Sequence, residues 1–315
     1  MRPDDDINPQ AIDPQAIDPQ AIDPQAIDPQ VFELYDEYCH SAMPRRVFLE
    51  RAAALTLVGG VSAMAMAQAL LPRYAEAQQI SFTDARITPR YVDYDSPGGT
   101  SGRMRGYLVQ PAGAGPFPAV IVIHENRGLN PYIEDVARRM AVEGFLALAP
   151  DGLAPVGGYP GNDDAGKALQ ASLDRGKLMT DLLNSARYLK AHTLATGKLG
   201  ATGFCFGGGV VNALAVEMGA DLQAGAPFYG AAAASADVPR IKAALLVHYA
   251  EDDPRINAMR PDFEAALKAS GVEHEMHVYP GTRHGFHNNS TPRYAPDAAA
   301  LAWSRTVAFF KQHLA

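Results

Sequence analysis

The segment from Lys198 to Val211 contains a turn that few backbones accommodate. An apolar run leads to Gly203, Cys205 stands between Gly203 and Gly207, and a helical pattern follows. This order is typical of a nucleophile elbow, Gly-x-nucleophile-x-Gly, with cysteine in the place where serine is usual. The flanking glycines are needed because a nucleophile on a strained turn leaves no room for side chains two residues away.

Two other interpretations of this segment remain open at this point. Free cysteine is among the most buried residue types, so a glycine-rich turn with a structural Cys205 is one alternative. A dinucleotide-binding turn is the other, but it requires Gly-x-Gly-x-x-Gly. Because Cys205 occupies the position of the second glycine, its side chain hinders the approach of a pyrophosphate.

Residues 9–28 are four copies of Pro-Gln-Ala-Ile-Asp. Proline at every fifth position prevents a regular helix, and the repeats offer little apolar surface to bury. A five-residue period is also far too short for a solenoid unit. We therefore predict a disordered extension over residues 1–43.

Residues 44–77 contain the three parts of an export signal. The paired Arg45 and Arg46 precede an apolar, Ala/Gly-rich stretch at 52–71, and a small-x-small site ends at Ala77. The pair resembles a twin-arginine signal, which predicts use of the twin-arginine export machinery, cleavage after Ala77, a periplasmic or secreted protein and no stable membrane anchor afterwards. An uncleaved anchor and a buried core helix are the alternatives, since the apolar run is about long enough to span a bilayer.

The remaining residues, 78–315, suit one domain with a substantial core. The chain is 47% hydrophobic and 20% charged, which is ordinary for a soluble globular protein. Its formal charge of −8 comes mostly from the acidic residues before Gln78. The rest has no basic stripe or acidic tail, so we predict no nucleic-acid partner.

The chain has two cysteines, Cys39 and Cys205. Cys39 precedes the predicted cleavage site, so the exported chain would hold one thiol and no internal disulfide. A lone thiol in an oxidising compartment is a liability unless it is buried or used. This favours a functional Cys205.

Apolar runs and helical patterns alternate through the rest of the chain. The continuous apolar run Pro118–His124 is typical of a strand buried on both faces of a parallel sheet. The expected strands are 102–109, 118–124, 144–149, the run leading into the elbow, 223–229, 243–249 and 274–279, and the expected helices are 132–143, 163–191, 210–218, 258–270 and 298–314. The alternation predicts an α/β fold with a mostly parallel central sheet and helices on both faces.

Four chemically capable side chains each follow an apolar strand-like run: Glu125, Cys205, Asp253 and His284. In parallel sheets chemistry gathers at the carboxyl ends of the strands. The order nucleophile, acid, histidine is that of the α/β-hydrolase fold. A thiolate can attack, an imidazole can take and return its proton, and a carboxylate can orient the imidazole.

The acid and the histidine each have an alternative. Asp252 competes with Asp253, but in a Gly-x-x-Asp turn after such a strand Ala250 takes the place of the glycine, which favours Asp253. A lone His284 would more simply be a loop histidine with local hydrogen bonds.

The pairs His274/His277 and His284/His287 could suggest a metal site. However, His274 and His277 are three apart on a strand and so point to opposite faces, and no Cys/Asp cluster supports a site. We therefore predict no metal site.

Glu125 directly follows a buried strand, where a carboxylate is costly unless it is paired or used. The non-functional alternatives for Glu125 are a solvated loop acid and a salt bridge to Arg127. The backbone amides of Phe206 and Asn126 are placed to form an oxyanion hole, one after the nucleophile and one in the loop after an earlier strand.

Residues 92–314 resemble the dienelactone hydrolase family. The resemblance rests on Ile123-His-Glu-Asn-Arg-Gly-Leu-Asn130, Gly203-Phe-Cys-Phe-Gly-Gly208, the segment 248–257 and Tyr279-Pro-Gly-Thr-Arg-His-Gly-Phe-His287. The signal and the segment 286–294 are similar to an exported branch of that family. The resemblance implies an α/β-hydrolase fold, a triad of Cys205, Asp253 and His284, no cofactor, and a Glu125 that contacts the resting thiol and swings away when substrate binds.

One departure from the family concerns the substrate. Its best-known members hold a substrate carboxylate with two arginines, where this chain has the arginine-free loop Leu153–Asn162 and Asn288. Arg127 and Arg293 are the candidate replacements. We expect a hydrolase that cleaves a small ester or lactone through a thioester on Cys205. The competing hypothesis is a non-catalytic binding or thiol-redox protein on the same scaffold.

Overall fold

The structure is a computed structural model that describes residues 27–41, 43–55 and 63–315. It divides into two compact units, Met1–Leu71 and Pro72–Ala315. The second unit therefore begins at Pro72 rather than at the predicted Gln78. Most of the repeats, through residue 26, and residues 56–62 of the predicted signal lie outside the described part.

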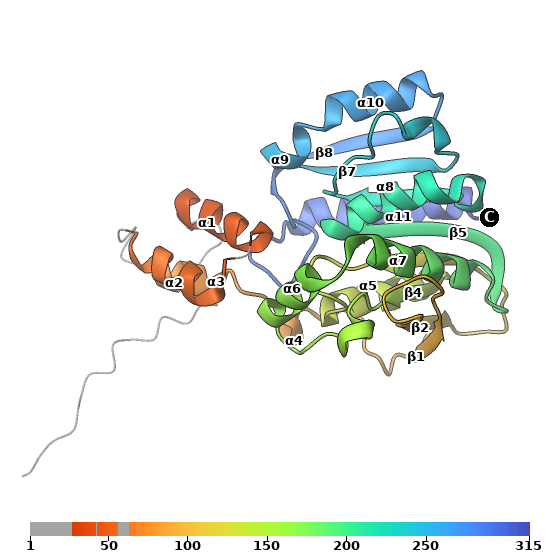
Figure 1. Cartoon of the computed structure of the whole chain (residues 1–315), viewed down its shortest axis with the longest axis horizontal. Helices are drawn as coiled ribbons and strands as arrows, with labels where there is room; N and C mark the ends of the chain where they lie inside the picture. Colours follow the sequence, from red (N-terminus) through yellow and green to blue (C-terminus); the bar gives the residue numbers. More distant parts are fainter. Residues whose placement is uncertain (1–26, 42, 56–62) are drawn as a thin grey trace, which may run out of the picture. The chain divides into compact units, whose positions relative to one another are not determined.

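The first unit contains a helix where disorder was expected. Helix α1 covers Pro29–His40, so the prediction of disorder is wrong for these residues (Figure 1). Asp28 caps it by accepting a hydrogen bond from the Gln30 amide at 2.7 Å, and a proline opens the first turn, where its missing N–H costs nothing. Beyond the last repeat its buried residues recur at helical spacing: Val31, Leu34, Tyr35 and Tyr38.

Two further helices, α2 (Arg45–Ala53) and α3 (Ala63–Ala69), belong to the same unit. Their buried side chains share a small core with α1, which includes Phe48, Met66 and Leu70. The described parts of the predicted signal are thus packed helices. Within the described residues, none of the helices has the length and apolar character needed to span a bilayer.

The second unit is built on one eight-stranded sheet in the order β1-β2-β4-β3-β5-β6-β7-β8. The strands are β1 (Ile87–Asp95), β2 (Arg103–Pro111), β3 (Phe117–Ile123), β4 (Leu146–Pro150), β5 (Ala195–Phe204), β6 (Ala224–Phe228), β7 (Ala244–Asp252) and β8 (His274–Arg283). Strands β3 to β8 run parallel, and β2 joins β4 antiparallel. The predicted mostly parallel α/β sheet is confirmed.

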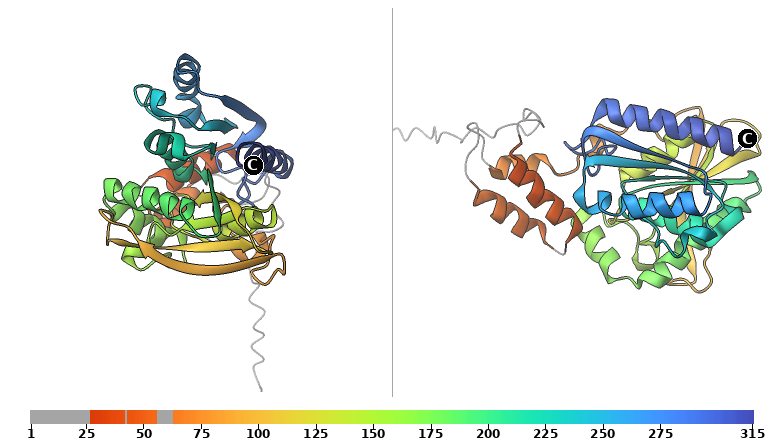
Figure 2. Two further views of the ribbon diagram at one scale, coloured as in Figure 1. Left: turned by 90° about the vertical axis from the view of Figure 1, so that its right-hand side faces the viewer. Right: turned by 90° about the horizontal axis from the view of Figure 1, so that it is seen from above.

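Helices cover both faces of this sheet (Figure 2). They are α4 (Tyr74–Ala77), α5 (Pro131–Val142), α6 (Asp163–Ser172), α7 (Arg175–Lys190), α8 (Phe206–Met218), α9 (Pro254–Asn257), α10 (Arg260–Ala269) and α11 (Pro296–His313). Helices α7, α8 and α10 contribute to one core, and α5 and α11 to the other. In β3, the Ile121 side chain lies in the first core and the Val120 side chain in the second. This is expected because successive side chains of a strand point to opposite faces and helices cover both faces of this sheet.

Three details differ from the sequence prediction. The expected helix 163–191 is two helices, because Asp174 accepts a hydrogen bond from the Lys177 amide at 2.8 Å and starts α7 anew. The helix after the elbow begins at Phe206, one turn earlier than expected. Strand β1 was not predicted, because it lies at the sheet edge and most of its residues are not buried.

The first residues of the second unit are part of its folded structure. The Tyr74 hydroxyl donates to Asp163 at 2.9 Å, and the Ala77 carbonyl accepts a hydrogen bond from the Asn289 side chain at 2.7 Å. Ala77 itself is only 7% exposed. The segment 72–80 is therefore tied to loops that lie far along the chain.

Candidate active site

Five neighbouring parallel strands bring a chemically capable residue to the same edge of the sheet. Glu125 lies just beyond β3, whereas Cys205, Tyr229, Asp253 and His284 directly follow β5, β6, β7 and β8. The carboxyl ends of parallel strands face one direction, so these residues form a single cluster. Sequence analysis named all of them except Tyr229.

Cys205 lies on the strained turn that the glycine pattern predicts. Its φ of 55° and ψ of −112° place it in a region that side chains other than glycine rarely adopt, at a cost of about 1–3 kcal/mol. A Cβ on Gly203 would lie 2.5 Å from the Gly207 carbonyl oxygen, and one on Gly207 would overlap the Ile123 carbonyl oxygen. The close approach of strand and helix thus explains both glycines.

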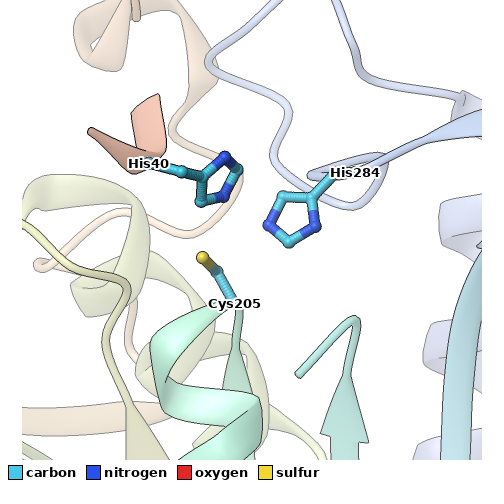
Figure 3. Close-up of side chains that lie close together, drawn as sticks. All are labelled: His40, Cys205 and His284. Atoms are coloured by element: carbon cyan, nitrogen blue, oxygen red, sulfur yellow. The ribbon is translucent and has the colours of Figure 1, made fainter. Parts of the chain in front are cut away.

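His284 faces Cys205. The Cys205 Sγ lies within 4.8 Å of a ring nitrogen of His284, and Figure 3 shows the sulfur and the ring on facing sides of the site. Cys205 is half-buried at the start of α8, and it forms no disulfide. The structure thus brings together the two residues that the sequence places 79 positions apart.

Asp253 holds the other side of the imidazole. Its Oδ2 lies 2.5 Å from the His284 Nδ1, and its Oδ1 accepts the Ile256 amide at 3.3 Å as the N-cap of α9. Asp252 is exposed instead and pairs with Arg283 at 3.0 Å. The structure therefore places Asp253, and not Asp252, against the imidazole, and the partner of His284 is not a local one.

The pKa of His284 is raised although the ring is only 4% exposed. Burial alone lowers this pKa, but the negative charge of Cys205 and the hydrogen bonds with Asp253 and Cys205 outweigh it. An imidazolium next to a thiolate is the pair of protonation states that such surroundings favour.

Glu125 is buried in the cluster, at 8% exposure, so the interpretation as a solvated loop acid is wrong. Its Oε2 accepts a hydrogen bond from the Asn288 side chain at 3.1 Å. Burial raises the pKa of Glu125, and the negative charge of Cys205 raises it further, whereas the charges of Arg127, Arg293 and His284 lower it. A raised pKa lets this carboxyl hold a proton close to the thiol.

The two candidate arginines have different surroundings. Arg127 forms an ion pair with Asp163 at 2.7 Å, and both side chains are at most 10% exposed, so much of its charge is compensated inside the protein. Arg293 instead lies over the glycine that follows His284, with Nη2 3.0 Å from the position of a Cβ on Gly285. Its charge acts on Glu125 from there.

The predicted oxyanion-hole residues flank the same cluster. Phe206 is the first residue of α8, where backbone amides have no partner within the helix, and Asn126 lies in the loop after β3.

Tyr229 is the residue that sequence analysis missed. It has a φ of 37°, is fully buried, and its ring centre lies 4.8 Å from that of His284. Its hydroxyl has no hydrogen-bond partner among the described residues. Its position at the end of the strand-like run 223–229 was the available signal, but a tyrosine there also fits an ordinary aromatic core.

Comparison with known proteins agrees with this arrangement. The model of the dienelactone hydrolase family matches residues 104–314, and a second model, described as YqhI-like, matches residues 21–55. An Escherichia coli protein named "Putative hydrolase fragment YghX" is 59% identical over 115 residues, covering 36% of this chain and 97% of its own length.

Two longer matches each cover about two thirds or more of the chain. A Synechocystis protein named "Putative carboxymethylenebutenolidase" is 34% identical over 235 residues, covering 67% of this chain and 93% of its own length. The solved structure of the dienelactone hydrolase-like promiscuous phosphotriesterase P91, from metagenomic libraries, has a TM-score of 0.64 and 27% identity, covering 73% of this chain and all of its own. The fold is therefore an α/β-hydrolase fold, and the chain is a hydrolase that belongs to the dienelactone hydrolase family.

Proposed function

We propose that the protein hydrolyses a small carboxylic ester or lactone with Cys205 as nucleophile, His284 as general base and acid, and Asp253 as the residue that orients His284. The proposal depends above all on one observation: Asp253 contacts one ring nitrogen at 2.5 Å, and the Cys205 sulfur lies on the other side of the ring. This is the geometry of a nucleophile, a base and an orienting carboxylate.

In the first half-reaction, His284 holds the thiol proton and the Cys205 sulfur attacks the carbonyl carbon, forming a carbon–sulfur bond. The negative charge that develops on the carbonyl oxygen is stabilised by the amides of Phe206 and Asn126. The carbon–oxygen bond of the ester then breaks, and His284 gives its proton to the departing alkoxide. A lactone keeps this hydroxyl within the same molecule.

In the second half-reaction, a water molecule attacks the thioester while His284 takes one of its protons. The carbon–sulfur bond breaks, the product leaves as a carboxylic acid, and the proton returns to Cys205. Asp253 stabilises the imidazolium in both halves.

We assign to Glu125 the control of the resting thiol. A buried carboxyl with a raised pKa can share a proton with the sulfur when no substrate is present. Its hydrogen bond to Asn288 defines the resting position. Substrate that displaces the carboxyl from this position would leave the thiolate paired with His284 alone.

The test is mass spectrometry of the intact protein during incubation with a panel of activated esters and lactones. We expect a transient mass increase equal to the acyl group, located on the peptide that contains Cys205. C205A should lose the adduct and lower kcat/KM by about 10⁴-fold or more. C39A is the matched control and should behave like the wild type.

Undiminished turnover by C205A would overturn the proposal. A Cys205 that is modified by peroxide or by disulfides but never by esters would support the thiol-redox alternative instead. Circular dichroism of C205A distinguishes loss of chemistry from loss of fold.

We further propose that residues 44–77 direct export by the twin-arginine route to the periplasm or beyond. The paired arginines open α2, where both side chains are exposed and so accessible to a receptor. Replacement of Arg45 and Arg46 by lysine should leave the protein in the cytoplasmic fraction, and an unchanged distribution would exclude this route.

A further inference from the structure

A cavity lies between α5 and α11, with a volume of about 310 Å³. Its lining includes Arg139, Val142, Glu143, His287, Tyr294 and Trp303. None of Cys205, Asp253 and His284 lines it.

His287 contributes a buried hydrogen-bond donor to this cavity. The ring is 1% exposed, and its Nδ1 lies 2.7 Å from the Tyr132 hydroxyl. Burial raises the pKa of Tyr132 well above its usual value, so the phenol keeps its proton. Its hydroxyl has no other hydrogen-bond partner among the described residues, so it donates to Nδ1, because a phenol that accepted there would leave its own buried O–H unpaired. The proton of the neutral imidazole is then on Nε2, which has no hydrogen-bond partner among the described residues.

Arg139 contributes a cation. Its guanidinium lies over the Trp303 ring, 4.0 Å from the ring centre. In the part of the chain that the structure describes, no carboxylate lies within ion-pair distance of it. Glu143, the acid in the lining, is paired with Lys311 at 2.9 Å. The side chain is therefore a half-buried charge without a counter-ion.

These two side chains supply donors, a full positive charge and no acceptor, which is the chemistry of an anion site. A planar carboxylate matches the fork of a guanidinium. Val142 and Trp303 give the wall apolar surface, beside the polar Gln79 and Tyr294. We propose that this cavity binds a small monocarboxylate with an apolar body, as a site separate from the Cys205 cluster.

A layer of aromatic side chains connects this cavity to the Cys205 cluster. Phe204, which precedes Cys205, stacks on His287 with ring centres 5.1 Å apart. Tyr132 packs edge-on against the same phenylalanine at 5.6 Å. A ligand on His287 would therefore contact residues that support the nucleophile without touching the nucleophile itself.

Trp303 makes the proposal directly testable because it is the only tryptophan in the chain. The full-length protein is titrated with cyclohexanecarboxylate, which does not absorb where tryptophan is excited, and Trp303 emission is recorded. We expect a saturable change. Cyclohexanecarboxamide, which has the same shape and no charge, should bind at least about tenfold more weakly.

Three variants define the contacts. R139Q should weaken carboxylate binding by about tenfold to a hundredfold, and R139K should retain part of it. A300F fills the mouth of the cavity from an exposed lining position, so it should reduce binding without changing the charge. C205A should bind like the wild type, which separates this site from the proposed nucleophile.

Equal binding of the amide, or an unchanged affinity in both R139Q and A300F, would overturn the proposal. Inorganic phosphate that binds as tightly as the carboxylate would refute the requirement for an apolar body. Thermal unfolding of each variant excludes a general loss of structure as the cause of weaker binding.

Discussion

His284 and His287 lie three residues apart in one loop but have very different surroundings. His284 and His287 are both nearly fully buried, at 4% and 1% exposure. The pKa of His284 is raised, whereas burial and the nearby charge of Arg139 hold the pKa of His287 well below its usual value.

The difference lies in the charged neighbours and not in burial. His284 contacts Asp253 and faces Cys205, so its protonated form is stabilised. His287 contacts a neutral phenol and lies near a cation, so its protonated form has no support. One ring is thus suited to moving protons, and the other to donating a fixed hydrogen bond.

The largest expected effect comes from removing the carboxylate charge of Asp253, which contacts His284. D253N should lower kcat by about 10⁴-fold, because the imidazole loses both its orientation and the partner of its protonated form. The measurement is steady-state hydrolysis of an activated ester. D252N, at the exposed neighbour, should be close to wild type, and an equal loss in both variants would contradict the assignment.

The two arginines next to the two histidines should have separable effects. R293Q should raise KM for a carboxylate-bearing ester by about tenfold and leave a neutral ester unaffected, because we expect the Arg293 guanidinium to pair with the substrate carboxylate. R139Q should leave both kinetic constants near wild type. Comparison of kcat and KM for the paired esters is the measurement, and a general loss of kcat in R293Q would indicate a structural role instead.

A smaller effect concerns Glu125 and stability. Because its pKa is raised in the folded state, the wild type should lose stability relative to E125Q as pH rises from about 4.5 through the raised folded-state value. Chemical denaturation across this range measures the difference. E275Q, at an exposed position, is the control. If the free energies of unfolding of wild type and E125Q change in parallel with pH across this range, Glu125 is ionised there and its pKa is not raised.

The smallest effect is expected at His287. Its pKa is depressed in the folded state, so its contribution to stability is present above the unfolded value of about 6.5 and is lost as pH falls below it. The stability difference between wild type and H287Q should therefore shrink in acid. A constant difference would show that the pKa of His287 is the same in the folded and unfolded states, and so that burial and Arg139 do not lower it.

The sequence predicted the parts of the molecule that follow from local pattern. Apolar runs located β3 and the strands from β5 to β8, and the order of residues after them identified Cys205, Asp253 and His284 as neighbours. The sequence pattern also explains the glycines around Cys205 by crowding, and the short distances in the structure agree with it. These features are local, or they are fixed by the rule that parallel strands end at one edge.

What could not be predicted depends on contacts between distant segments. The Asn288–Glu125 hydrogen bond and the Arg127–Asp163 pair join loops whose approach no local pattern encodes. Helix α1 was missed because the proline repeats before it dominate the composition of that region. Tyr229 was missed because a buried tyrosine fits a core as well as a site.

The burial of Ala77 has a consequence for maturation. The Ala77 carbonyl accepts a hydrogen bond from Asn289. A peptidase that cuts at the predicted position must therefore act before the second unit, Pro72–Ala315, has folded around this peptide bond, or must pull the bond free. A cut there would also remove Tyr74 and leave Asp163 with one donor fewer. A cut at this position would in this way couple the timing of processing to the final shape of the loop that carries Arg127.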